Sequence, residues 1–149
     1  MVERLQEQGV DASVATNLEQ AARAADIISC ATLSTAPLIR GEWLQPGTHL
    51  DLIGGFTPAM RESDDACFAR GTVFVDTSEA LMKSGDILEP IASGAWDQSR
   101  LAATLEDLCR SKHVGRSSAE EITVYKAVGT ALEDVAAASL AYDAFMAAA

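Results

Sequence analysis

The chain has 149 residues, of which 48% are hydrophobic and 22% charged, and these values are typical of one globular domain. Its formal net charge of −11, spread along the sequence, would repel phosphates and so argues against a nucleic-acid partner. No run of about 18 apolar residues could span a membrane, and the charged start of the chain is unlike a secretory signal.

The first part of the chain predicts two short helices and a strand. The helices are expected over Glu3–Gln8 and Leu18–Ala24, with a strand candidate at Ala12–Ala15 between them. Asn17 is a good N-cap for the second helix. The apolar run Asp26–Thr32 comes next, and its lack of alternation favours a strand that is covered on both faces, as in a parallel sheet.

The rest of the chain continues this alternation. His49–Ile53 is a strand that stops at two glycines, and Thr72–Asp76 is a strand rich in β-branched residues. The remaining predicted elements are helical segments at Gly41–Leu44, Ser63–Ala69, Ser78–Lys83 and Leu101–Leu108, a strand at Glu121–Tyr125, and an alanine-rich helix from Thr130 onward. Strands that alternate with helices predict an α/β fold with a mainly parallel sheet.

Cysteine and histidine usage limits the possible chemistry. The three cysteines, Cys30, Cys67 and Cys109, are widely spaced and odd in number, which favours reduced thiols and a cytoplasmic location over a disulfide framework. With only His49 and His113 and no C-x-x-C pair, we expect no metal site.

Polar or glycine-rich segments follow three of the predicted strands, where ligands collect in open α/β sheets. These segments are Ala31–Ser34, Ile53–Pro58 and Asp76–Ser78. The paired glycines would let a ligand approach the backbone closely, but they could equally form a plain tight turn. The hydroxyls could equally serve as turn or cap residues. The G-x-G-x-x-G loop of dinucleotide-binding folds is not found, so the residues alone indicate an α/β domain with a possible ligand crevice.

Motifs along almost the whole chain are similar to those of a known family. They are Ala25–Thr32, Pro37-Leu38, Leu44–His49, Ile53–Gly55, Pro58, Arg61-Glu62, Val75-Asp76, Gly115-Arg116, Glu121–Thr123 and Lys126–Asp134. In this order they resemble the ornithine cyclodeaminase/μ-crystallin family. The resemblance implies an incomplete Rossmann-type parallel sheet flanked by helices, and a C-terminal helix that would pack on a dimerisation domain missing from this chain.

The resemblance also implies how the chain is divided. Residues 1–115 would be part of a dinucleotide-binding domain, and residues 116–149 a segment that returns toward the absent N-terminal domain. The first Rossmann strand, the glycine loop and the strand that reads the adenosine ribose would precede this sequence, which is therefore expected to be a C-terminal fragment. A homodimer, or association with the missing domain, is the expected assembly.

The family resemblance assigns an NAD(P)H site but no catalytic residue. Cofactor contacts are implied for Ala31, Thr32, Leu33, Gly54, Gly55, Phe56, Gly129 and Thr130. In cyclodeaminases the residue after the paired glycines looks to be a catalytic aspartate, and a phenyl ring at this position cannot accept a proton. Phe56 therefore favours reduction of Δ1-pyrroline-2-carboxylate or Δ1-piperideine-2-carboxylate. Alternatives are a cyclodeaminase-like lyase, a μ-crystallin-like protein that binds NADPH and a small ligand without turnover, and a non-catalytic interaction domain.

Three charged residues near these loops receive ordinary structural roles. For Arg61 and Lys126 we expect surface salt bridges, and for Glu62 a role in capping the next helix. In the C-terminal helix, Leu132, Val135 and Leu140 share one face. That face is expected to be exposed and to drive self-association or partner binding, unless the helix folds back on its own sheet.

Overall fold

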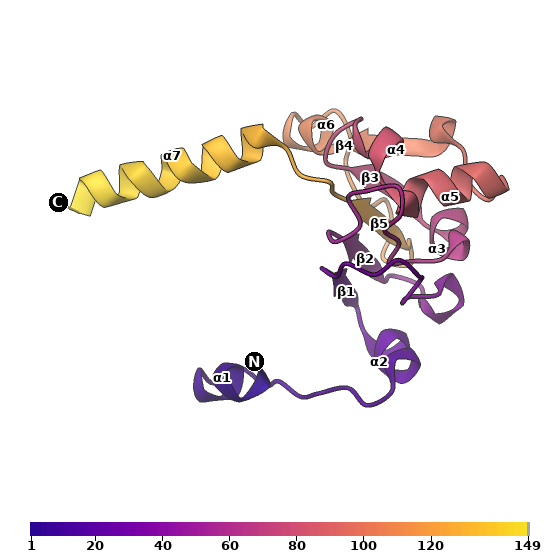
Figure 1. The fold of residues 1–149 in the computed structure, drawn as a ribbon, viewed down its shortest axis with the longest axis horizontal. Coiled ribbons are helices and arrows are strands. Elements are labelled where there is room, and N and C mark those ends of the chain that lie inside the picture. Colours follow the sequence, from indigo (N-terminus) through magenta and orange to yellow (C-terminus); the bar gives the residue numbers. More distant parts are fainter. Residues whose placement is uncertain (149) are drawn as a thin grey trace.

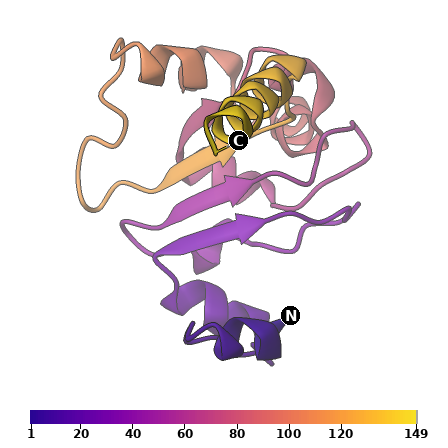
Figure 2. The same ribbon diagram turned by 90° about the vertical axis from the view of Figure 1, so that its left-hand side faces the viewer.

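The computed structural model describes residues 1–148 and shows an α/β fold built on one sheet of five parallel strands (Figures 1 and 2). The strands are β1 (Ile27–Cys30), β2 (His49–Leu52), β3 (Thr72–Val75), β4 (Leu101–Thr104) and β5 (Thr123–Lys126). Their order in the sheet is β1-β2-β5-β3-β4, so the last strand of the chain lies at the centre. The predicted fold class, α/β with a parallel sheet, is confirmed.

Side-chain caps begin several of the helices that connect the strands. The Asn17 side chain accepts a hydrogen bond from Gln20 N, as predicted, and Asp64 and Thr104 act similarly at two other helices. Each cap satisfies a backbone N–H that has no partner within the helix. The helical segments are α1 (Val2–Glu7), α2 (Leu18–Ala24), η1 (Gly41–Trp43), α3 (Asp65–Arg70), α4 (Ala80–Lys83), α5 (Gly85–Ser93), η2 (Gln98–Arg100), α6 (Leu105–Cys109) and α7 (Ala131–Ala148).

One face of the sheet carries the core. Because side chains alternate along a strand, the register places Leu50, Val124 and Val73 in one row across β2, β5 and β3. The next row toward the carboxyl ends contains Leu52, Lys126 and Val75 in the same strands. All are buried, and the apolar ones belong to a cluster that includes Phe68 of α3 and Ile87 of α5. A lysine thus occupies a core position of the central strand.

The opposite face is open at β1, contrary to the expectation of a strand covered on both faces. Ile27 is 69% exposed, Ser29 is exposed, and of the four residues in β1 only Cys30 is buried. Ser29 Oγ donates a hydrogen bond to Asp51 on this polar face. β1 is an edge strand, so its apolar run forms here although residues 1–148 do not cover both of its faces.

Two predicted elements differ from the structure, and one helix was not predicted. No strand forms at Ala12–Ala15, where the chain is irregular and largely exposed. The segment Leu101–Leu108, predicted as a helix, divides at Thr104 into β4 and α6. Helix α5 was not predicted because Pro90, which lacks the N–H that a helix interior uses, lies inside it.

Helix α7 extends away from the sheet (Figure 1, yellow). None of its described residues is buried, and Leu132, Val135 and Leu140 are 78%, 62% and 73% exposed. The alternative that this helix folds back on its own sheet is therefore wrong. Among residues 1–148, no helix is both long and apolar enough to cross a membrane.

Candidate functional site

Three loops meet at the carboxyl edge of the sheet, after β1, β2 and β5. These strands are neighbours and parallel, so the loops that follow them are brought to the same edge. The loops carry all of the residues to which the family resemblance assigns cofactor contacts: Ala31–Leu33, Gly54–Phe56 and Gly129–Thr130. Leu33 and Phe56 are 69% and 47% exposed, whereas both glycines of the pair are buried.

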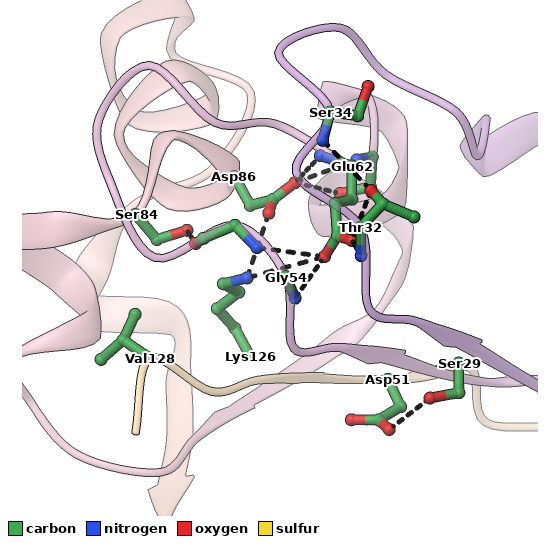
Figure 3. Close-up of polar contacts among 12 residues, drawn as sticks. Ser29, Thr32, Ser34, Asp51, Gly54, Glu62, Ser84, Asp86, Lys126 and Val128 are labelled. Atoms are coloured by element: carbon green, nitrogen blue, oxygen red, sulfur yellow. Dashed lines mark hydrogen bonds and ion pairs between the residues drawn. The ribbon is translucent and has the colours of Figure 1, made fainter. Parts of the chain in front are cut away.

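Glu62 joins the first two loops (Figure 3). Its Oε1 accepts hydrogen bonds from Thr32 N at 2.6 Å and from Thr32 Oγ1 at 2.8 Å. Its Oε2 accepts from Gly54 N at 2.8 Å and from Gly55 N at 3.2 Å. The side chain is fully buried. The predicted helix-capping role of Glu62 is wrong, because Asp64 caps α3.

Lys126 lies beneath these loops in a buried ion pair (Figure 3). Its Nζ is 3.2 Å from Asp86 Oδ2 and 4.0 Å from Glu62 Oε2, and all three side chains are 0% exposed. The predicted surface salt bridge of Lys126 is therefore wrong, because strand alternation turns its side chain toward the core face. Arg61 does form a salt bridge, with Asp65, but its side chain is only 19% exposed.

The paired glycines are required by the protein's own packing. A Cβ on Gly54 would lie 1.9 Å from Thr32 O, and one on Gly55 would lie 2.4 Å from Asp86 Oδ2. Real Cβ atoms do not approach other atoms so closely, and neither glycine has a positive φ. Atoms of Thr32 and Asp86 thus fill the space that side chains at Gly54 and Gly55 would occupy. A contact between these glycines and a ligand stays a proposal.

Asp76, at the end of β3, holds the third loop. Its carboxylate accepts hydrogen bonds from Thr77 N, Val128 N and Gly129 N, each at 2.7 Å. Gly129 has a φ of +79°, which favours glycine, and no atom lies within 4 Å of its Cβ direction. Thr130 borders a separate hollow of about 450 Å³ with Asp76, and this hollow lies beside β3, β4 and the start of α7.

Burial and nearby carboxylates determine the protonation of the cysteine at this edge of the sheet. Burial, together with the nearby carboxylates of Glu62 and Asp86, raises the pKa of the Cys30 thiol to about 12, so this cysteine is not a thiolate nucleophile at neutral pH. Among the described residues 1–148, no group of three or more His, Cys, Asp or Glu side chains is arranged to hold a metal ion.

The sequence predicts ordinary structural roles for Glu62 and Lys126 and does not single out Asp86. Lys126 directly follows the predicted strand Glu121–Tyr125, two residues after Val124, and this spacing could have indicated an inward-facing side chain. Glu62 and Asp86 give no comparable signal, because Glu62 lies in an irregular segment before α3 and Asp86 lies in the first turn of α5, which was not predicted.

Comparisons with known proteins agree with this architecture. A family model described as "Ornithine cyclodeaminase/mu-crystallin family" matches residues 1–148. A Δ1-pyrroline-2-carboxylate reductase of Paracoccus denitrificans is 42% identical over 140 residues, which are 93% of this chain and 44% of that protein. A ketimine reductase mu-crystallin of Macropus fuliginosus is 37% identical over 136 residues, which are 91% of this chain and 40% of that protein.

A solved structure shares the fold. It is the Thermococcus litoralis Δ1-pyrroline-2-carboxylate reductase in complex with NADH and L-proline, with a TM-score of 0.89 and 32% sequence identity. The match covers 95% of this chain and 44% of that one. The chain thus spans less than half the length of the relatives it matches.

Proposed function

The chain belongs to the ornithine cyclodeaminase/mu-crystallin family, and from this membership we propose that it forms the nicotinamide-facing part of the NAD(P)H site of a reductase. The proposed substrates are cyclic imine 2-carboxylates: Δ1-pyrroline-2-carboxylate, reduced to proline, and Δ1-piperideine-2-carboxylate, reduced to pipecolate. The proposed cofactor contacts are those of the three loops at the carboxyl edge of β1, β2 and β5.

Phe56 is the observation that carries this proposal. It follows the buried glycines and is 47% exposed at the carboxyl edge, where a lyase of this family would need an acidic side chain. A phenyl ring cannot take a proton from an amino-acid substrate, but it can contact a flat ring and exclude water. Leu33, exposed on the neighbouring loop, offers a second apolar surface. The nicotinamide, when bound, supplies the hydride, and the protein orients it.

Parts of the relatives that this chain does not match would supply the remaining contacts. We propose that they bind the pyrophosphate and the substrate carboxylate. Residues 1–115 would then belong to the dinucleotide-binding domain. Residues 116–149 would connect this domain to the rest of the protein, with β5 in the sheet and α7 outside it. Dimerisation, or docking of α7 on another domain, and a cytoplasmic location also stay predictions.

A chimera tests the proposal directly. This chain would replace the matching segment of the P. denitrificans reductase, and the unaltered reductase would be the control for folding and activity. With either cyclic imine we expect oxidation of NADH or NADPH, and with L-ornithine no release of ammonia. Ammonia release would instead support a lyase. Dinucleotide binding without turnover of either imine would support a ligand-binding protein like the μ-crystallin alternative.

A further inference from the structure

Every polar atom of Glu62 has a partner. Its backbone N donates to Asp86 Oδ1 at 2.8 Å, and its carbonyl oxygen accepts from Leu38 N at 2.8 Å and Ile39 N at 3.0 Å. Its carboxylate accepts the four hydrogen bonds from Thr32, Gly54 and Gly55. The residue is 0% exposed. Hydrogen bonds to its backbone therefore fix the position of Glu62, and its side chain holds the loops after β1 and β2 together.

We propose that Glu62 is a positioning residue that sets the separation of the loops Ala31–Leu33 and Gly54–Phe56. In the proposed function these loops are the two walls against which the nicotinamide lies, so the catalytic consequence rests on that function. The geometric part does not, because it concerns only bonds within this chain. Glu62 itself is buried behind both loops and would act through them, not by touching a ligand.

The pattern of donors explains why a carboxylate is needed here. Three of the four groups that face the side chain are backbone N–H groups of Thr32, Gly54 and Gly55, and a backbone N–H cannot become an acceptor. A glutamine has the same size but only one acceptor oxygen. Its NH₂ group would face either Thr32 N or the N–H groups of the glycine pair, which would leave a buried donor without a partner.

Buried charged groups next to Glu62 connect the third loop to the same network of polar contacts. Asp86 Oδ1 also accepts from Ser63 N at 2.9 Å, and its Oδ2 pairs with Lys126, the residue from which the third loop begins. Ser84 Oγ donates to Gly55 O at 2.6 Å and so fixes the second loop from its other side. The three loops are thus joined by buried polar contacts, with Glu62 between the first two.

The first experiment measures amide hydrogen exchange in Glu62→Gln. We expect at least ~10-fold faster exchange at Thr32, or at Gly54 and Gly55, because charge-assisted hydrogen bonds to buried donors are lost. The amide of Thr72, which donates to Ile122 O at the opposite edge of the sheet, is the internal reference and should not change. Glu42→Gln is the matched control, since the Glu42 side chain is 64% exposed. Unchanged exchange at Thr32, Gly54 and Gly55 would overturn the proposal.

A second variant covers the case in which Glu62→Gln does not fold. Thr32→Val removes the hydroxyl, which donates to Glu62 and accepts from Ser34 N, and keeps the backbone N–H and the shape of the side chain. Faster exchange at both Thr32 and the glycine pair would then support the proposal that Glu62 holds the two loops together. Exchange that does not change at the glycine pair would show that the two loops are held independently, against the proposal.

The second experiment measures the effect on the reaction in the chimera. Displacement of the nicotinamide by about 1 Å can cost ~100-fold in rate, so Glu62→Gln should lower kcat by about that factor. The KM for the dinucleotide should change little, and the kinetic isotope effect with deuterated NADH should rise. Unaltered kcat and isotope effect, despite faster exchange, would refute the role in catalysis. If the unsubstituted chimera does not reduce the imines, the proposed function fails, and the exchange data alone decide the positioning role.

Discussion

Gly54→Ala tests whether the loops after β1 and β2 have a fixed separation. A Cβ at this position would lie 1.9 Å from Thr32 O, 2.4 Å from Thr32 N and 2.4 Å from Glu62 Oε1. The first two are backbone atoms, so they can yield only if the whole loop moves. Gly94→Ala is the control, because nothing lies within 4 Å of its Cβ direction although its φ is +75°.

The two substitutions differ in their expected cost. Alanine at Gly94 should cost about 1–2 kcal/mol, the penalty for a left-handed conformation. Alanine at Gly54 adds overpacking of about 1–3 kcal/mol to the loss of charge-assisted hydrogen bonds worth about 1.5–3 kcal/mol, so we expect roughly 2.5–6 kcal/mol. For a chain of this length each kcal/mol lowers the Tm by roughly 2–4 °C.

Urea unfolding followed by tryptophan fluorescence measures this difference. Trp43 and Trp96 are 9% and 2% exposed, and Trp96 packs edge-on against Phe68 with ring centroids 6.0 Å apart, so unfolding changes the surroundings of both. Gly54→Ala should move the midpoint further toward low urea than Gly94→Ala does. A Gly54→Ala protein as stable as the Gly94→Ala control would refute the reasoning, because the loop of Thr32 would then move freely.

Three further predictions concern other parts of the chain. The chain should self-associate in a light-scattering concentration series, because the apolar face of α7 is exposed. Leu140→Lys on that face should reduce the association without lowering the Tm, whereas the control Gln98→Lys should leave the association unchanged. A monomer at all concentrations would contradict this prediction. Hydrogen bonds from Thr72 and Ser117 lower the pKa of Glu121 to about 2, so its contribution to stability is present above its ordinary pKa of 4.5 and is lost as the pH falls toward 2. Urea midpoints across that range should therefore fall less steeply in Glu121→Gln, and equal slopes would argue against it. In the folded chain a thiol reagent should modify Cys109, which is exposed, and leave the buried Cys30 and Cys67 until urea is added; fast modification of all three would contradict the structure.

The sequence predicted the sheet because its signals were local. Apolar, β-branched runs such as Thr72–Asp76 identify strands from their own residues, and the alternation with helices predicts parallel pairing. The position of the three loops at one edge followed from that pairing. Strand β4 escaped prediction since Leu101–Thr104 contains two alanines, which favour helices, and no valine or isoleucine. The N-cap Thr104 marks where the helix begins.

The charged groups under the loops could not be predicted in the same way. Glu62, Asp86 and Lys126 come from distant points of the chain, and charged residue types ordinarily indicate a surface position. Only the spacing of Lys126 from Val124 points the other way. Their burial depends on one another, because a carboxylate or ammonium group is stable in a core only when it is paired or hydrogen-bonded. Only the folded arrangement shows that the partners are present, and with them the reason why Gly54 and Gly55 lack side chains.

The backbone N–H groups at this edge of the sheet already donate to side chains, and this determines which kind of ligand the edge suits. Phosphate sites in α/β folds use free N–H groups at loops and helix N-termini. Here the N–H groups of Thr32, Gly54 and Gly55 already donate to Glu62, and those of Val128 and Gly129 donate to Asp76. A dinucleotide diphosphate would therefore find these donors already engaged by buried carboxylates. The exposed Leu33 and Phe56 suit a flat, uncharged or cationic ring, which is why the proposed contacts of these loops are with the nicotinamide and not with the phosphates.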